Sequence, residues 1–273
     1  MRHYSKILVP YDGSISTEHT LRDACRIARW NNSHVLVAVP FFSQDNDKGG
    51  FKDAIIDGVR LISRQEKIEM EALFQDGRPS DTIIDVSHQK ENDLIVMGKA
   101  EMNAFEKFII SSFTGRIIGH AKCDVFIIPE DAPLRWWSRI LLAADGSPSS
   151  LAAVDNAVDY ARQHGGAINA VGVVDLNDEF YALSPDGANT IIATLNRQLD
   201  EIVAKARSAG VPAESFLREG ESAAKILEVA EETKASSIFM GSHARVGVMS
   251  LLMGSVGRKV AMNSSCPVFI IKP

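Results

Sequence analysis

The chain repeats itself once, and this repeat constrains the fold more than any other feature. Residues 6–14 (KILVPYDGS) return at residues 139–147 (RILLAADGS), at an offset of 133 residues. Residues 94–98 (LIVMG) and 123–128 (CDVFII) return later as SIFMG and CPVFII, both at an offset of 143. Because self-similarity over this distance is typical of a duplicated structural unit, we expect two copies of one domain. The second copy has gained ten residues between its first match and its later ones.

The domain boundaries follow from the repeat and from the segment between the copies. A length of 273 residues is enough for two domains that each bury a core. Residues 129–137 (PEDAPLRWW) contain two prolines and no helical period. We therefore expect a first domain at 1–130, a linker at 131–137 and a second domain at 138–273. Trp136 and Trp137 are predicted to hold the linker against a domain surface, and stacking on a ligand is the alternative.

Short apolar runs alternate with segments of helical period in both copies. This alternation predicts parallel strands joined by crossover helices, and runs this apolar indicate strands covered on both faces. The expected fold class is α/β, with two tandem doubly wound domains that each contain a five-stranded parallel sheet. The predicted strands are 7–10, 35–39, 70–74, 94–97 and 125–128 in the first copy, and 140–143, 168–174, 213–217, 238–240 and 268–271 in the second.

Helix signals occupy the segments between these runs. Ser14 or Ser16 can cap the first helix, and Ser80 and Ser222 are interpreted as the start of the helix before the fourth strand of each copy. The ten additional residues fall around the second helix, which is expected at about 51–67 in the first copy and about 188–209 in the second.

Composition and charge exclude several classes of protein. The chain carries 29 Lys and Arg against 35 Asp and Glu, and this net charge of −6 removes the attraction that drives non-specific nucleic-acid binding. No run approaches the roughly 20 apolar residues of a membrane span. The three cysteines form no CxxC pair, and no HExxH or similar spacing indicates a metal site. We expect a cytoplasmic protein without nucleic-acid or membrane partners.

A glycine-rich loop after the fourth strand of the second copy is typical of a site that binds anions. In such sheets, ligands bind beyond the carboxyl ends of the strands. Gly241 and Gly254 lack side chains, so backbone amides can approach a phosphate, and Ser255 adds a donor at a helix start. Residues 241–259 contain no Asp or Glu, but they contain His243, Arg245, Arg258 and Lys259. The sequence therefore predicts a phosphate cradle, and its spacing is not the Walker pattern.

These residues resemble the nucleotide-binding pattern of universal stress proteins. Gly241 is followed by Ala244 where the pattern has a second glycine, then by nine residues and Gly254-Ser255, and an Asp-Gly-Ser follows the first strand. The resemblance spans essentially the whole chain. It implies a Rossmann-like sheet of the adenine nucleotide alpha hydrolase type, a site for ATP or another adenine nucleotide, and a regulatory role in the stress response.

The resemblance also assigns residues to the parts of the nucleotide. It places the adenosine against Asp145 and the adenine edge against the backbone of Val173. The ribose and phosphates would contact Gly241, Ala244, Gly254, Ser255 and Val256, and the predicted site is completed by Ala144, Met240 and His243. Any Mg²⁺ would arrive with the nucleotide, because this ion prefers phosphates and water to an all-protein cage.

The first copy departs from this pattern at both ends of the ligand. At the offset of 143, Glu101 and Ser111 stand where the second copy has Ala244 and Gly254. A carboxylate near phosphate is repelled by about 1 kcal/mol even in water at close range. At the offset of 133, Pro40 stands opposite Val173 and offers no backbone N–H. We therefore predict that the first site is degenerate.

The candidate residues also have purely structural explanations. Turn formation or helix capping by Asp-Gly-Ser accounts for Asp12 and Asp145 without a ligand. Gly241 and Gly254 could serve a loop that closes against its neighbour, and His243 could be a solvated loop residue.

Three functions remain open at this point, ranked by the motifs. The first is a nucleotide-binding regulator, and the second is an interaction scaffold that binds no nucleotide and works through an unidentified protein partner. An ATP-dependent enzyme ranks last, because no general base, nucleophile and orienting group converge in the sequence. The resemblance further implies an internal pseudo-dimer in which 125–128 faces 268–271, and a homodimer of whole chains stays open.

Overall fold

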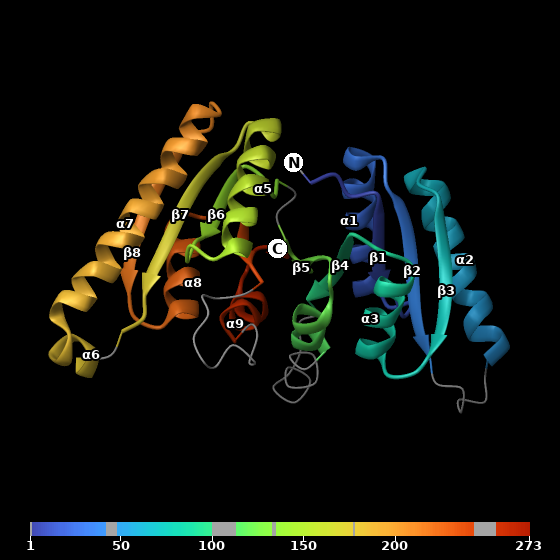
Figure 1. Cartoon of the computed structure of the whole chain (residues 1–273). Helices are drawn as coiled ribbons and strands as arrows, with labels where there is room; N and C mark the ends of the chain where they lie inside the picture. Colours follow the sequence, from blue (N-terminus) through green and yellow to red (C-terminus); the bar gives the residue numbers. More distant parts are fainter. Residues whose placement is uncertain (1, 42–47, 100–112, 133–134, 177, 243–254) are drawn as a thin grey trace. The chain divides into compact units, whose positions relative to one another are not determined.

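The computed structural model describes residues 2–41, 48–99, 113–132, 135–176, 178–242 and 255–273. The chain divides into two compact units, Arg2–Asp131 and Ala132–Pro273 (Figure 1). Each unit contains a parallel β-sheet covered by helices, so the α/β fold class predicted from the sequence is confirmed.

The N-terminal unit contains five parallel strands in the order β3-β2-β1-β4-β5. Ile7, Leu8 and Val9 of β1 are all fully buried, because helices cover both faces of the central strand. The strands are β1 (Lys6–Pro10), β2 (His34–Phe41), β3 (Met70–Asp76), β4 (Leu94–Lys99) and β5 (Asp124–Pro129).

The C-terminal unit repeats this sheet in the order β8-β7-β6-β9-β10. Its first strand, β6, pairs with β7 on one side and with β9 on the other, so the winding direction reverses next to β6. Ligands bind at such switch points in open α/β sheets. The strands are β6 (Arg139–Ala143), β7 (Ala167–Val174), β8 (Ala213–Glu219), β9 (Ser237–Gly241) and β10 (Val268–Ile271).

Helices connect the strands and form a layer on each face of each sheet. Right-handed crossovers put the helices before and after the reversal on opposite faces. In the N-terminal unit these are α1 (Ile15–Asn31), α2 (Lys48–Glu66), α3 (Pro79–Gln89) and a helix at 113–120. In the C-terminal unit they are α5 (Pro148–His164), α6 (Asp178–Leu183), α7 (Pro185–Ser208), α8 (Ser222–Glu232) and α9 (Ser255–Asn263).

The first helix of each unit is capped by the serine of its Asp-Gly-Ser. The Ser14 hydroxyl accepts the backbone N–H of Thr17 at 3.3 Å, and the Ser147 hydroxyl accepts that of Ser150 at 3.1 Å. The cap is therefore Ser14 and not Ser16. These bonds satisfy N–H groups that the first turn leaves without helical partners.

The predicted start of α8 is confirmed, and the predicted start of α3 differs from the structure by one residue. α3 begins at Pro79, so Ser80 is its second residue, and Ser222 is the first residue of α8. The cap of α8 is Glu221, whose carboxylate accepts the Ala224 N–H at 2.7 Å. A long acidic side chain can replace serine here because the helix dipole favours negative charge at its start.

The additional residues of the second copy lie in and before its second helix. α7 has 24 residues and α2 has 19, and the six-residue α6 precedes α7. The sequence predicted a start near residue 188, whereas Pro185 opens the helix. Proline suits the first helical turn because it needs no N–H partner there.

The two linker tryptophans lie inside the C-terminal unit. Trp136 is 2% exposed and Trp137 is 4% exposed, and the Trp137 ring stacks on Tyr160 of α5 with a centroid distance of 4.5 Å. Phe239 and Phe269 pack against the same ring. The prediction of attachment to a domain surface is corrected, because both side chains are part of the core.

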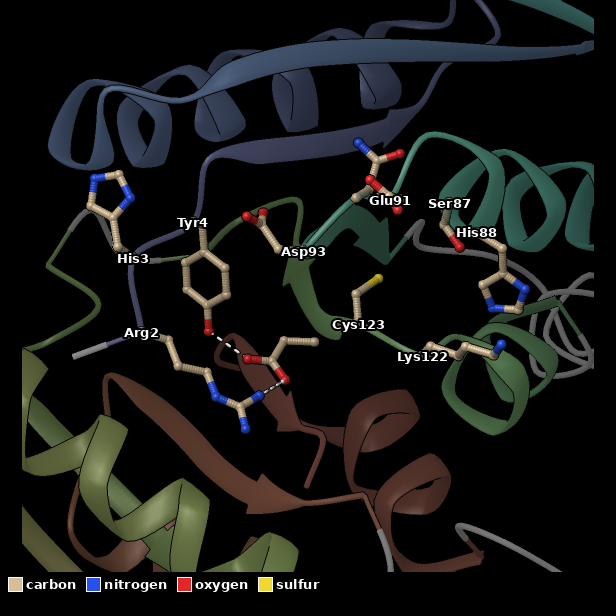
Figure 2. Close-up of a pocket in the computed structure, with 11 residues that line it drawn as sticks. Arg2, His3, Tyr4, Ser87, His88, Glu91, Asp93, Lys122 and Cys123 are labelled. Atoms are coloured by element: carbon tan, nitrogen blue, oxygen red, sulfur yellow. Dashed lines mark hydrogen bonds and ion pairs between the residues drawn. The ribbon is translucent and has the colours of Figure 1, made fainter.

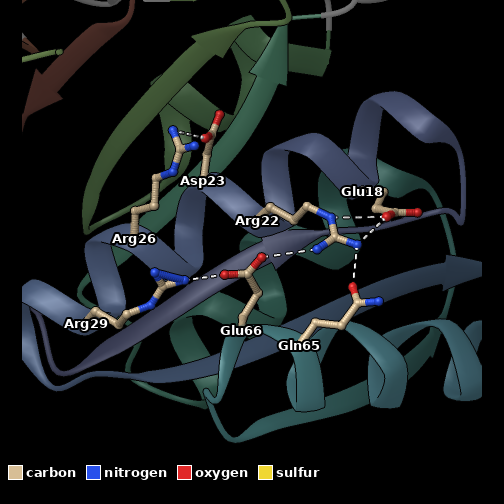
Figure 3. Close-up of polar contacts among 7 residues, drawn as sticks. All are labelled: Glu18, Arg22, Asp23, Arg26, Arg29, Gln65 and Glu66. Carbon is tan, nitrogen blue, oxygen red and sulfur yellow. Dashed lines mark hydrogen bonds and ion pairs between the residues drawn. The ribbon is translucent and has the colours of Figure 1, made fainter. Parts of the chain in front are cut away.

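An ionic network joins α1 to α2 in the N-terminal unit (Figure 3). Arg22 donates to Glu18 at 2.7 Å and to Glu66 at 3.1 Å, and Arg29 also pairs with Glu66. Burial raises the pKa of the Glu66 carboxyl, but the hydrogen bonds from the two arginines outweigh this, so its pKa lies below the ordinary value. The network fixes α2 against α1.

The cysteines and hydropathy agree with a chain built around apolar cores. Cys25 and Cys266 are buried, and burial raises the pKa of the Cys25 thiol to about 12.

Over the residues the structure describes, no helix is long and apolar enough to cross a membrane. Within the same residues, no three His, Cys, Asp or Glu side chains are grouped so that they could hold a metal ion.

Candidate functional site

The described part of the predicted site lies at the carboxyl ends of β6, β7 and β9. Ala144 and Asp145 directly follow β6, Val173 is the penultimate residue of β7, and Met240 and Gly241 end β9. Because β6 pairs in parallel with both β7 and β9, these ends meet at one edge of the sheet. The structure therefore brings together residues that are about 100 positions apart in the sequence.

The phosphate end of the site is described only in part. His243, Ala244 and Gly254 lie outside the described residues, and the side chain of Ser255 is likewise not described. Val256 lies in the first turn of α9 and is half-buried. Because β10 runs parallel to β9, α9 must run antiparallel to both strands, so its N-terminus is directed to the edge where Asp145 and Gly241 lie.

Asp145 lies in a tight turn between β6 and α5. Its carboxylate accepts the backbone N–H of Ser147 at 2.9 Å, and its own N–H donates to the Ser150 hydroxyl at 3.3 Å. Gly146 makes this turn possible, because its φ of +73° lies in the left-handed region that side chains disfavour. Asp145 thus has the turn-forming role that its sequence context indicated. It is also half-buried at the candidate site.

Asp12 is the equivalent residue in the N-terminal unit, and its carboxylate accepts more hydrogen bonds from its own chain than that of Asp145. The Asp12 carboxylate accepts the Ser14 N–H at 2.9 Å and also the Thr17 hydroxyl at 2.7 Å. Burial raises the pKa of Asp12, but these hydrogen bonds outweigh burial, so its pKa lies below the ordinary value. Within the described residues Asp145 accepts only the single bond from Ser147, so it keeps more capacity to accept hydrogen bonds from a ligand.

The backbone of Val173 is directed past the end of β6. The Val171 carbonyl accepts the N–H of Ala144 on the β6 side, and the Val174 carbonyl accepts the N–H of Gly220 on the β8 side. Successive residues of a strand direct their backbone groups to alternate sides, so the N–H and C=O of Val173 are directed to the β6 side. At that level β6 has ended at Ala143, and a ligand can take the place of a strand.

The N-terminal unit has the same geometry without the same donor. The Ala38 carbonyl accepts the N–H of Tyr11 at 2.9 Å, which matches the bond between Val171 and Ala144. Pro40 therefore occupies the position of Val173 and has no N–H to donate.

Close packing against the start of α5 requires a glycine at position 241, whether or not a ligand binds. A Cβ at this position would lie 2.6 Å from the Ser150 nitrogen and 2.7 Å from the Ser149 carbonyl carbon, so no side chain fits against the start of α5. Gly98 holds the equivalent position and would meet the Thr20 hydroxyl. Since both units keep this glycine, close packing accounts for it in both units, and the glycine does not by itself indicate a phosphate site.

One polar side chain near the site was not expected from the sequence. A Cβ at Gly146 would lie 2.7 Å from the Gln198 Oε1 atom, so the amide of Gln198 on α7 packs directly on the turn of Asp145. This oxygen is buried and has no hydrogen-bond partner among the residues that the structure describes. At the offset of 143 the N-terminal unit has Ile55, whose side chain packs on Gly13. Comparison of the two copies at this offset could have identified Gln198.

The family model of the universal stress protein family matches residues 3–129 and again residues 137–272. The chain belongs to the universal stress protein family. The resemblance inferred from the glycine spacing is thereby confirmed, and so is its tandem form.

Similar proteins support the same assignment. A universal stress protein of Methanocaldococcus jannaschii is 32% identical over 141 residues, which cover 50% of this chain and 82% of that protein. One from Mycolicibacterium smegmatis is 29% identical over 200 residues, which cover 70% of this chain and 65% of that protein. The crystal structure of a universal stress protein from Archaeoglobus fulgidus superposes with a TM-score of 0.75 at 21% identity, covering 98% of this chain and 96% of that one. The last likeness shows a shared fold over both universal stress protein units.

Proposed function

We propose that the C-terminal unit binds ATP or a related adenine nucleotide and that the chain acts as a regulator of the stress response. The observation that carries this proposal is the difference between two equivalent strand ends. In the C-terminal unit, an Asp145 carboxylate with spare acceptor capacity lies beside the backbone of Val173, which is directed into the space beyond β6. In the N-terminal unit, the Thr17 hydroxyl already donates a hydrogen bond to the Asp12 carboxylate, and Pro40 has no backbone N–H to donate.

The geometry suggests how a nucleoside would lie at this edge. The Val173 N–H and C=O form a donor and acceptor pair that matches the polar edge of an adenine ring, whose nitrogen accepts and whose amino group donates. Asp145 can accept a hydrogen bond from a ribose hydroxyl. The phosphates would then extend toward the start of α9, where helix N–H groups favour anions. Any Mg²⁺ would bind through those phosphates.

We propose regulation by binding and not an enzymatic reaction. Backbone amides and one carboxylate that already forms a turn supply recognition more readily than proton transfer. A nucleotide that binds one conformation of the chain more tightly would shift the population toward that conformation. The N-terminal unit would then contribute structure or a partner surface and no second nucleotide site.

The test begins with the chain as it is purified under native conditions. Mass spectrometry of the released small molecules should detect an adenine nucleotide. Gly254→Glu should abolish this retention, because the side chain adds bulk and negative charge where phosphate is expected. The matched control is Ser111→Glu, which places the same residue at the equivalent position of the N-terminal copy and should leave retention unchanged.

Two outcomes would contradict the proposal. One is a folded protein that neither retains an adenine nucleotide nor is stabilised against heat by millimolar ATP with Mg²⁺. This outcome would favour an interaction scaffold. The other is retention that Ser111→Glu abolishes and Gly254→Glu does not.

A further inference from the structure

The N-terminal unit has a polar cavity at the amino ends of its strands. The candidate nucleotide site of the C-terminal unit lies at the carboxyl ends of its strands. The volume of the cavity is about 460 Å³, within the range of small-molecule sites. The cavity is lined by residues that precede β1, β4 and β5 and by the end of α3 (Figure 2). Because these strands are parallel, their amino ends form the edge that lies away from Asp12.

The same corner of the C-terminal unit can be identified from equivalent backbone bonds. The Asp93 N–H donates to the Lys6 carbonyl at 3.1 Å, and the Ser236 N–H donates to the Arg139 carbonyl at 2.8 Å. These bonds confirm that the offsets of 133 and 143 pair the residues on either side of this corner. The tandem copy therefore provides an internal comparison for every residue of the cavity.

Two buried tryptophans lie at this corner in the C-terminal unit. The buried Trp136 and Trp137 take the places of His3 and Tyr4. The polar residues on the facing side are replaced as well: Asn92 by Ala235, Lys122 by Ser265 and Asp124 by Pro267. One copy thus buries two tryptophans at this corner, and the other keeps Asn92, Lys122 and Asp124 around a cavity.

Part of the polar lining of the cavity is bound within the protein. Asp124, which is 1% exposed, accepts from the Arg2 guanidinium at 2.8 Å and from the Tyr4 hydroxyl at 2.6 Å. Asp93 accepts the backbone N–H groups of Ser5 and Lys6 at 2.7 and 3.0 Å. These bonds hold the walls in place, and the Asp93 carboxylate lies beside the cavity.

Other groups of the lining have no partner among the residues that the structure describes. Asn92 is 8% exposed, and its Oδ1 atom is buried without a hydrogen bond, although its amide nitrogen donates to Lys6. The Nε2 atom of His88 is buried without a partner as well. The Lys122 ammonium forms no ion pair with a described residue. A buried polar atom without a partner costs free energy, which a ligand that bonds to it would recover.

We propose that this cavity binds a small zwitterion of the amino-acid type. The Lys122 ammonium offers donors and positive charge to a carboxylate, and the His88 ring offers a nitrogen that can donate a hydrogen bond. The Asn92 side-chain oxygen and the Asp93 carboxylate offer acceptors to an ammonium group. Figure 2 shows Lys122 and His88 on one side of the view and Asp93 on the other, beside Tyr4. The opposite charges of the lining thus match the two ends of one ligand, and this inference is independent of the nucleotide proposed for the C-terminal unit.

The test uses the full chain and a mixture of the protein amino acids as probe. The ring signals of His88 in a ¹³C–¹H spectrum, assigned by their loss in His88→Gln, should shift with the mixture and then with one of its members. Lys122→Ser and Asn92→Ala, which install the residues of the other copy, should each weaken that affinity about tenfold. Lys122 is exposed, so its replacement should not disturb folding. Lys90→Ser is the matched control, because Lys90 is an exposed lysine that does not line the cavity.

Three results would overturn the inference. The first is no shift of the His88 signals with millimolar amino acids in a protein whose spectrum shows it folded. The second is equal weakening by Lys122→Ser and Lys90→Ser, since this would indicate a general charge effect. The third is an equal shift with acetate alone, because the ammonium group would then play no part.

Discussion

The Thr17 hydroxyl donates a 2.7 Å hydrogen bond to the carboxylate of Asp12. The C-terminal unit has Ser150 in the place of Thr17, and there the hydroxyl accepts from the Asp145 N–H and gives no such bond to the carboxylate. Two turns of the same sequence, Asp-Gly-Ser, therefore leave their carboxylates in different states. One carboxylate is engaged by its own helix, and the other can still bind a ligand.

This difference predicts unequal effects of two matched substitutions. Asp145→Asn should weaken ATP binding about tenfold, the value of one charge-assisted hydrogen bond. Asp12→Asn removes the same charge at the equivalent turn and should leave ATP affinity unchanged. Asparagine keeps an oxygen that can accept the serine N–H, so both turns should persist. Fluorescence titration with an ATP analogue would measure both affinities, and equal losses would contradict the assignment to the C-terminal unit.

The end of the second strand gives a second matched pair. Val173→Pro removes the backbone N–H that we assign to the base, and ATP affinity should fall at least about tenfold. The N-terminal unit shows that a proline is compatible with this position, because Pro40 lies within β2. Pro40→Val should leave ATP binding as it is. A Val173→Pro chain that binds ATP normally would exclude the Val173 N–H from recognition.

The close packing of Gly241 predicts a difference in stability. Gly241→Ala should lower the free energy of unfolding by about 1–3 kcal/mol, because its Cβ would meet backbone atoms of Ser149 and Ser150 that cannot move alone. Gly98→Ala should cost less, since there the nearest atom is the side-chain hydroxyl of Thr20. Urea denaturation of both variants would compare the two costs. A larger loss for Gly98→Ala would contradict this explanation of the glycines.

The ionic network of Figure 3 predicts a dependence of stability on pH. The pKa of Glu66 is lower in the folded chain than in the unfolded one, so its contribution is fully present above the unfolded pKa of about 4.3. It is lost as the pH falls below that value and through the folded pKa. Glu66→Gln should therefore cost about 1 kcal/mol near neutral pH and little in strong acid. Glu18→Gln, which removes a more exposed partner of Arg22 alone, should cost less at every pH, and a cost of Glu66→Gln that persists in acid would contradict the assignment to charge.

The sequence predicted the parts of this molecule that depend on local pattern. The apolar runs identified the strands, and the repeat identified equivalent residues such as Pro40 and Val173. Side-chain packing between distant segments was not predicted. The stacking of Trp137 on Tyr160 is one such contact, and the packing of Gly241 on α5 is another. The local sequence around a linker tryptophan does not indicate which core its side chain enters.

The candidate site shows the same division. The resemblance to universal stress proteins indicated Asp145 and Val173, but not that Thr17 binds Asp12 while Ser150 leaves Asp145 free to accept. Threonine and serine both supply a hydroxyl, so this difference arises from geometry that the sequence does not record. The unpartnered oxygen of Gln198 was missed for a similar reason, since its helix contacts the turn only in the folded chain.

The most direct test of the central claim is the number of ATP molecules that one chain binds. Isothermal titration of the full chain with ATP and Mg²⁺ should give one site per chain, and Val173→Pro should weaken binding at that site at least about tenfold. Two equivalent sites per chain, or none in a folded chain freed of any retained nucleotide, would contradict the claim that only the C-terminal copy binds.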